Sequence, residues 1–286
     1  MAIVAFWSEE EKETGQTMSM VALSTYMAIE HNYRILDISA NFKDQTLENS
    51  YWDTTKMDNL VKTIVNSENV NVNASQIGLE SGIEGLVKIV NSNKTTKNII
   101  SNYAKVVFNN RLDVLCSAKT QDYEEYVEIC KVYPTILQVA NRDYDLVFID
   151  ISKKMPEEQK NKILEIADVI IVNITQRLKT IDSFVKLRQE NEFFKKNNIL
   201  LNIGRYDKFS KYNVKNITRY IREKKDIYAI PYNTLFFESC SEGNVAELFL
   251  RIRKIDEEDR NAIFMDEIRR LTKDLIYKMQ ELQLKV

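Results

Sequence analysis

The sequence predicts an α/β fold in which a mostly parallel central sheet carries helices on both faces. Short, continuously apolar segments alternate with longer segments whose apolar residues recur at helical spacing. Strands that are apolar throughout are typical of a parallel sheet buried on both sides. Only 6 Gly and 3 Pro occur in 286 residues, which favours regular elements over a turn-rich all-β design. No repeat or linker interrupts this pattern, so we expect residues 1–286 to form a single domain, with 242–286 as a C-terminal helical extension.

Each expected element follows from its own pattern. Residues 2–7 and 145–150 are apolar runs, the second ending in an acid, and both are expected to be buried strands. Residues 18–28 have a helical pattern directly after the first strand. The other expected strands cover 33–39, 111–117, 168–174, 198–203 and 227–231. The other expected helices cover 57–66, 82–90, 95–103, 121–140, 156–166, 178–196, 213–223 and most of 242–284, and 67–81 is expected to be a polar loop.

The composition excludes several classes of protein. With 44% hydrophobic and 29% charged residues, the chain is typical of a globular protein rather than a disordered one. The net charge of −2 gives no global attraction for nucleic acid. The 3 cysteines lack metal-ligand spacing and the only histidine is His31, which argues against a zinc site or a histidine-based triad. No leader pattern or membrane-spanning run is found, so we expect a cytoplasmic protein.

The beginning of the chain has the strand–loop–helix–strand order of a phosphate-binding loop. The loop ends in Gly15-Gln16-Thr17, where a working loop has Gly-Lys-Thr or Gly-Lys-Ser. Such a loop binds phosphate through backbone N–H groups at a helix N-terminus, a lysine, and a hydroxyl that binds Mg²⁺. Here the lysine is replaced by a neutral glutamine, and three glutamates at 9–11 precede the loop. Since hydrogen bonds to charged groups are worth about 1.5–3 kcal/mol each, triphosphate binding should be weakened severely.

Three further motifs follow in order. Residues 144–150 read Tyr-Asp-Leu-Val-Phe-Ile-Asp, residues 167–172 read Ala-Asp-Val-Ile-Ile-Val, and residues 229–233 read Ala-Ile-Pro-Tyr-Asn, followed by Ser-Glu-Gly-Asn-Val at 241–245. With the loop at the start, these motifs resemble the MinD/ParA family of deviant-Walker P-loop ATPases over nearly the whole length of the chain. The resemblance implies that family's fold, in which 144–150 is the Walker B strand.

The departures from the family pattern affect its chemistry. The family's signature lysine falls at about Glu11, and its catalytic lysine falls at Gln16. The acid that orients the attacking water falls at Ser39, with Asn41 two residues later, and the asparagine that reads adenine falls at Gly204. The resemblance therefore supports the fold and argues against efficient ATP hydrolysis. Among the family's branches, the TadZ/CpaE-type pilus localisation proteins look closest.

The candidate nucleotide site has two interpretations. In the first, the loop, the helix start and the Walker B acid still bind ATP, with Mg²⁺ held by Thr17 and Asp150. The residues that would bind nucleotide are Thr14, Gly15, Gln16, Thr17, Met18 and Asp150. In the second, the loop is a vestigial turn, with Thr14 or Thr17 capping the first helix. No catalytic residue is assigned in either case. Asp37, inside an apolar strand, should pair with Arg34 or another cation or lie at a frayed strand end, because unpaired burial is costly.

Two other segments are candidates for binding. Basic residues interleaved with aromatic ones can contact nucleic acid, although the alternative is a solvated helix face. This basic cluster consists of Arg205, Lys208, Lys211, Lys215 and Arg219. Residues 263–282 form an amphipathic pattern that should pack on the domain or on a partner; its acidic residues make peripheral membrane contact improbable.

These observations leave three functional hypotheses. The first is a degenerate MinD/ParA-like scaffold or positioning factor for a pilus, secretion or transfer machine, acting as a homodimer with protein partners. Its acidic loop would contact basic partners in place of phosphates. The second is a weak, atypical ATPase switch with ATP and Mg²⁺ at an altered site. The third is a module for DNA partition or tethering that uses the basic cluster.

Overall fold

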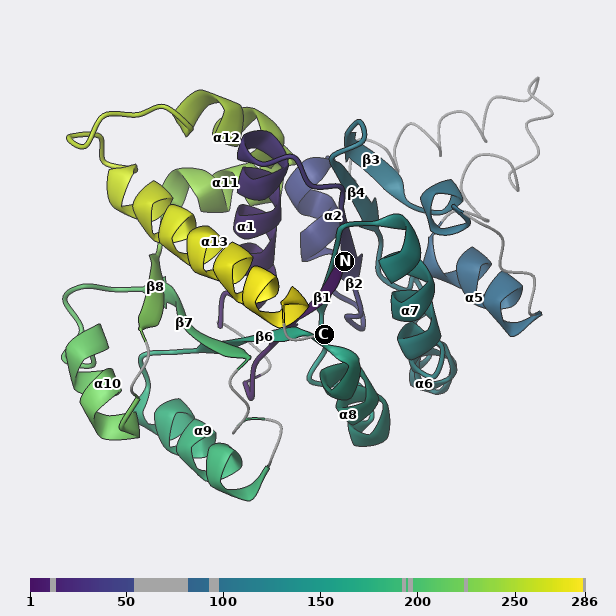
Figure 1. Ribbon diagram of the computed structural model, residues 1–286, viewed down its shortest axis with the longest axis horizontal. Coiled ribbons are helices and arrows are strands. Elements are labelled where there is room, and N and C mark those ends of the chain that lie inside the picture. Colours follow the sequence, from purple (N-terminus) through teal and green to yellow (C-terminus); the bar gives the residue numbers. More distant parts are fainter. Residues whose placement is uncertain are drawn as a thin grey trace.

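A central sheet with helices on both faces forms the body of the protein (Figure 1), as predicted. The computed structural model describes residues 1–10, 14–53, 82–92, 98–191, 194, 198–223 and 226–284. Within them the sheet has eight strands in the order β3-β4-β2-β5-β1-β6-β7-β8, parallel except for β3, which runs antiparallel to β4. The strands are β1 Ala2–Trp7, β2 Ile35–Ser39, β3 Lys105–Phe108, β4 Leu112–Leu115, β5 Leu146–Asp150, β6 Val169–Ile174, β7 Ile199–Tyr206 and β8 Ile227–Pro231.

The helices form two layers, one on each face of the sheet (Figure 1). One layer contains α1 Gln16–Glu30, α2 Thr46–Tyr51, α11 Thr234–Glu242, α12 Val245–Ile252 and α13 Ala262–Gln283. The other contains α5 Ile83–Asn91, the short 3-10 helix Ile100–Asn102, α6 Tyr123–Cys130, α7 Tyr133–Asp143, α8 Glu157–Ile166, α9 Leu178–Glu190 and α10 Val214–Ile221. Alternate residues of each strand supply the two apolar cores between sheet and helices.

Strand β1 lies at the centre of the sheet, between β5 and β6. All six of its residues are buried, and they alternate between the two cores: Val4 and Phe6 face α1, while Ala5 and Trp7 face the opposite layer. After β1 the chain enters α1 on one face, and after β5 it enters α8 on the other. Crossovers that leave in opposite directions open a crevice at the carboxyl ends of the strands, which is where open α/β sheets bind ligands.

The C-terminal helix α13 is part of the main body of the protein. It packs against β8 and α1 (Figure 1). Its apolar residues belong to the same core as those of α1 and α12. Its buried side chains are Phe264, Met265, Ile268, Leu271, Leu275 and Met279. The predicted amphipathic pattern is therefore explained by packing within the chain. Among the described residues, none of the helices is long and apolar enough to cross a membrane.

Several local predictions were wrong. The expected helix at 121–140 is two helices, α6 and α7, because a turn separates them before Pro134 in the first turn of α7. Strand β3 and the short helices α2 and α11 were missed, and the described part of 95–103 contains only a 3-10 turn. The helix expected at 57–66 and the loop expected at 67–81 lie outside the described residues.

A close backbone contact joins β7 to the loop after β1. A Cβ atom built on Gly204 would lie 2.0 Å from the carbonyl oxygen of Thr14, and 3.2 Å from the Cα atom of Gly15. No side chain fits between these two backbone segments. Glycine is therefore required at position 204 if the loop is to lie against the end of β7.

We predict that Gly204→Ala destabilises the protein by about 2–4 kcal/mol, because the loop must move away from β7 to admit the methyl group. The free energy of unfolding in urea measures this effect. Gly85→Ala, inside α5, is the control and should be neutral or stabilise by up to about 1 kcal/mol, since alanine favours helix. Equal stability of the two variants would contradict the contact.

Candidate functional site

The candidate site lies at the carboxyl ends of β1, β2 and β5. Asp150 is the last residue of β5 and is fully buried. Gln16 and Thr17 are the first two residues of α1. Gly15 precedes them with φ of 68°, a left-handed conformation that glycine adopts without strain. The turn at Gly15 directs the first residues of α1 towards the end of β5.

The side chain of Gln16 points into the protein and links the start of α1 to the ends of β1 and β5. Its Nε2 atom donates hydrogen bonds to Asp150 Oδ1 at 2.5 Å, to the carbonyl oxygen of Ile151 at 2.9 Å and to that of Phe6 at 3.1 Å. Two amide hydrogens thus serve three acceptors. Gln16 stands where the family has its catalytic lysine, and here its polar end is committed to the protein's own acceptors.

Two further neutral donors bind the other oxygen of Asp150. Thr17 Oγ1 donates at 2.6 Å and Asn41 Nδ2 donates at 2.5 Å to Oδ2. Burial raises the pKa of Asp150 to about 6, although the hydrogen bonds from Thr17, Gln16 and Asn41 lower it and nearby Asp44 raises it. The carboxylate is therefore bound at both oxygens by uncharged groups, in surroundings that disfavour its negative charge.

The hydroxyl that was expected to cap α1 does not do so. The N-cap residue is Gly15, which has no side chain to act as a cap. Thr14 is buried, and its Oγ1 accepts a hydrogen bond of 3.3 Å from the backbone N–H of Gln16. The Thr17 hydroxyl instead donates to Asp150. These two residues, predicted to hold Mg²⁺ together, are thus adjacent and hydrogen-bonded directly to each other.

The described glutamates of the loop are bonded within the chain. Glu9 forms an ion pair of 2.8 Å with Lys153, in the segment after β5. Glu10 accepts hydrogen bonds from the hydroxyl groups of Thr175 and Thr180, beyond the end of β6. Glu9 and Glu10 thus tie the loop to two neighbouring segments, while their contact with basic partners stays a prediction. Glu11, Lys12 and Glu13 lie outside the described residues.

The described residues on the β7 side of Gly15 are closely packed. Gly15 and Met18 line a cavity of about 20 Å³, together with Arg205, Tyr232 and neighbouring residues. The guanidinium of Arg205 lies 5.4 Å from the centre of the Tyr232 ring, and Arg205 has a φ of 54°. A cavity of this size has room for about one water molecule.

Tested against these contacts, the residues present do not fit a magnesium–triphosphate group. Both oxygens of Asp150 are already bonded, and Gln16 carries no charge to neutralise phosphate. Among the described residues there is also no cluster of three or more His, Cys, Asp and Glu able to hold a metal ion. The predicted nucleotide and magnesium roles of these residues stay predictions.

Asp37 does not behave as predicted. It lies in the middle of β2, fully buried, and burial raises its pKa well above its usual value. Ser24 Oγ donates to one of its oxygens at 2.6 Å, while the other has no partner. The prediction failed because β2 is covered on both faces, and no cation among the described residues contacts this carboxyl group.

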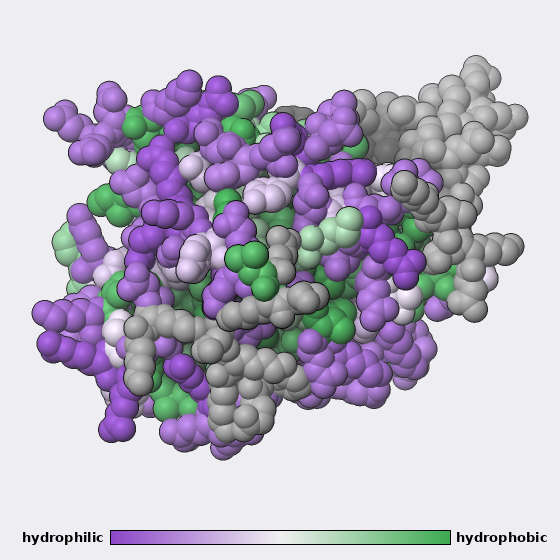
Figure 2. Space-filling model, in the orientation of Figure 1, coloured by the Kyte–Doolittle hydropathy of each residue, from purple (hydrophilic) through white to green (hydrophobic). Residues whose placement is uncertain are grey.

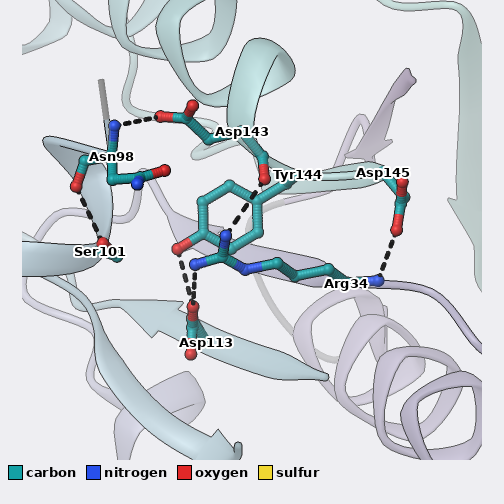
Figure 3. A network of polar contacts seen from close by, with 7 residues as sticks. All are labelled: Arg34, Asn98, Ser101, Asp113, Asp143, Tyr144 and Asp145. Atoms are coloured by element: carbon teal, nitrogen blue, oxygen red, sulfur yellow. Dashed lines mark hydrogen bonds and ion pairs between the residues drawn. The ribbon is translucent and has the colours of Figure 1, made fainter. Parts of the chain in front are cut away.

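Arg34, the expected partner of Asp37, belongs to a different network (Figure 3). Its guanidinium lies over the Tyr144 ring at 4.5 Å and 3.6 Å from Asp113, which also accepts a hydrogen bond of 2.7 Å from the Tyr144 hydroxyl. Its backbone N–H donates to Asp145 at 2.9 Å. Arg34 directly precedes β2, and Tyr144 and Asp145 directly precede β5. The network therefore connects the beginnings of these strands, at the end of the sheet opposite Asp150.

The basic cluster is spread along an exposed surface. Arg205 is the next-to-last residue of β7, Lys208 and Lys211 follow in the loop, and the other two basic residues lie on α10. All five side chains are exposed. Phe209, beside them, has 86% of its surface exposed, and the Lys208 ammonium lies 5.2 Å from its ring.

Known structures of the same architecture identify the fold. They include a ParA family ATPase from Chlorobium tepidum (TM-score 0.64, 15% identity, covering 97% of this chain and 98% of that one) and the septum site-determining protein MinD from Pyrococcus horikoshii, complexed with Mg-ADP (0.63, 14%, 97% and 98%). A third is MinD in the MinC:MinD cell division complex of Aquifex aeolicus (0.60, 15%, 96% and 96%). No protein-family model and no curated protein matches the sequence. This chain therefore has the ParA/MinD-like P-loop fold.

We predict that Asp150→Asn changes how stability depends on pH. The folded-state pKa of about 6 exceeds the value of 3.8 for an unperturbed aspartate, so protonation favours the folded chain. This contribution is fully present below about pH 4 and is lost as the pH rises through about 6. The free energy of unfolding of the wild type should therefore fall by about 2–3 kcal/mol relative to the variant over this range, and stay level above it.

Urea unfolding at a series of pH values measures the difference in free energy of unfolding between the wild type and the variant. The other buried acids are present in both proteins, so their contributions cancel. Asp256→Asn, in the exposed segment between α12 and α13, is the control and should show a level difference. A level difference for Asp150→Asn as well would contradict the buried, charge-disfavouring environment of Asp150.

Proposed function

We propose that this protein is a ParA/MinD-fold scaffold or positioning factor that has lost efficient ATP hydrolysis. It would act in the cytoplasm as a homodimer with protein partners, in a pilus, secretion or transfer machine. The observation that carries this proposal is the inward-pointing Gln16, whose amide binds Asp150, Ile151 and Phe6 in place of a phosphate. The fold of its structural neighbours supports the architecture, and the site supports the loss of chemistry.

The energetics of the site favour a ligand-free state. In a working phosphate loop, a lysine and a magnesium ion neutralise the terminal phosphates. Here a magnesium–triphosphate group that used Asp150 would have to replace its hydrogen bonds from Gln16, Thr17 and Asn41, and it would meet a neutral glutamine at position 16. It would also meet the carboxylates of Glu9 and Glu10. Each of these costs opposes binding, and none is offset by a charge at position 16.

The same edge of the sheet presents groups suited to binding a protein. Phe42 follows β2 and contacts Tyr123 edge to face, with 5.7 Å between the ring centres. Tyr123 has 47% of its surface exposed. The ammonium groups of Lys43 and Lys154 lie 4.9 and 5.7 Å from the Phe42 ring. Aromatic residues are enriched in protein interfaces, and a cation over an aromatic ring is attracted by the negative face of that ring. This surface, close to the closed site, is a suitable place for a partner to contact a constitutive scaffold.

Titration with nucleotide tests the proposal directly. We predict no heat of binding and no change in molar mass when the wild-type protein is titrated with Mg²⁺ and a non-hydrolysable ATP analogue up to about 1 mM. Calorimetry measures the binding and light scattering measures the mass. Asp150→Ala should give the same result, since Asp150 has no ligand to hold.

Micromolar binding that drives dimer formation and is lost in Asp150→Ala would overturn the scaffold proposal and support the weak ATPase switch. A protein that forms a dimer without nucleotide would agree with the proposal, because a scaffold does not need a nucleotide to assemble.

DNA tethering is a second candidate, favoured by the exposed basic cluster and the exposed Phe209 beside it. Phosphate contacts by several lysines and arginines make DNA affinity strongly dependent on salt. If the cluster binds DNA, replacing Lys208, Lys211 and Lys215 by Glu should abolish the retention of duplex DNA at about 50 mM salt.

Fluorescence anisotropy of a labelled duplex measures this retention across a salt series. The control replaces Lys162 and Lys131, which lie on α8 and just after α6, by Glu and should leave DNA affinity unchanged. Equal loss in both variants, or no retention by the wild type, would exclude the cluster as a DNA site.

A further inference from the structure

Strand β8 forms the outer edge of the sheet, and among the described strands it pairs only with β7. Its outward backbone groups are hydrogen-bonded to side chains. The N–H of Ala229 donates to Glu267 Oε2 at 3.1 Å, and the carbonyl oxygen of Ile227 accepts from Arg270 Nη2 at 3.0 Å. Glu267 and Arg270 belong to α13 and form an ion pair of 2.8 Å with each other. This ion pair takes the place of a neighbouring strand and covers the edge.

An open groove follows this edge. Its volume is about 480 Å³, and its walls come from the two helices on opposite faces of the sheet, with Val214 and Thr218 on α10 and Ile263 on α13. Ile227 and Ala229 of β8 lie between these walls. Ile263 has 62% of its surface exposed. The groove therefore combines apolar walls with the outward backbone groups of a strand.

The charges of the groove favour a basic ligand. Among the described residues, the charged ones that line it are Asp226, Glu267 and Arg270, two carboxylates against one guanidinium. The Asp226 side chain has 79% of its surface exposed and lies 4.0 Å from Arg270, a distance at which an exposed pair gains little. A cationic side chain in the groove would thus find a carboxylate that is weakly engaged.

We propose that this groove binds an extended, basic segment of a partner protein, which adds to β8 as a further strand. The segment's backbone would bond to Ile227 and Ala229, its apolar side chains would contact Val214 and Ile263, and its basic side chains would face Asp226 and Glu267. Addition of a strand to an open sheet edge obtains affinity from the backbone and specificity from alternate side chains. Until it binds, Glu267 and Arg270 satisfy the edge.

A second copy of this chain is a poorer fit for the groove. Edge-to-edge pairing of two β8 strands would bring together two sheets, each with its own flanking helices. Because α10 and α13 flank β8, a second sheet with its own helices would have to enter between these two walls. The site therefore suits a single peptide segment.

The proposal is tested by nuclear magnetic resonance with isotope-labelled full-length protein. The probe is a capped peptide of about ten residues in which valine and lysine alternate. We expect saturable shifts of the Ile227 and Ala229 amide signals, with slowed hydrogen exchange at Ala229. The same peptide with alternate N-methylated residues cannot form a ladder and should bind at least about tenfold more weakly, as should a peptide of alternating valine and glutamate.

Two matched variants complete the test. Asp226→Lys should weaken binding of the lysine peptide and strengthen that of the glutamate peptide. Asp266→Lys makes the same charge change on α13 at a residue that does not line the groove, and should alter neither. The proposal is overturned by absence of shifts at about 1 mM peptide, by equal binding of the N-methylated peptide, or by equal effects of the two charge changes.

Discussion

The buried carboxylate of Asp150 is the constraint on which the candidate site depends. An ionised carboxylate removed from water needs hydrogen bonds or an opposite charge; without them the group is protonated instead, as the raised pKa of Asp37 indicates. In this chain Gln16, Thr17 and Asn41 meet that requirement, and they come from the start of α1 and the end of β2. These bonds fix the positions of β1, β2 and β5 relative to α1. The ion pair and hydroxyl contacts of Glu9 and Glu10 then hold the preceding loop in place.

Glutamine is well suited to this role, and lysine would not be. The amide of Gln16 is neutral, so it can lie among the carbonyl oxygens of Phe6 and Ile151 without the desolvation cost of an ammonium group. Its two hydrogens are shared between these carbonyl oxygens and Asp150. The absence of a charge at position 16 thus has two effects: it stabilises the ligand-free loop and it removes the group that would attract phosphate. The contact of Gly204 with Thr14 closes the loop from the side of β7.

Much of the fold could be predicted from the sequence, because strands buried on both faces are apolar throughout and stand out between amphipathic helices. The elements that were missed have weaker signals. Strand β3 is a half-exposed edge strand with residues such as Lys105, and α2 is only six residues long. At the site, Gln16 was recognised as a replaced lysine, but its hydrogen bond to Asp150 joins residues more than 130 positions apart in sequence. Asn41 was noted without a role for the same reason, and the burial of Asp37 depends on neighbours that one strand's pattern does not reveal.

The way the site is satisfied also bears on whether the protein can act as a switch. A ligand shifts a conformational equilibrium only by the difference between its affinities for the two states. In a nucleotide switch, the phosphates and the metal supply that difference by bonding to the loop in one state alone. Here Asp150 is already bonded to the start of α1 through Gln16 and Thr17, so a nucleotide could bind these described side chains only by replacing bonds that already exist. The balance of hydrogen bonds thus favours one persistent conformation, which suits a protein that offers a fixed surface to partners.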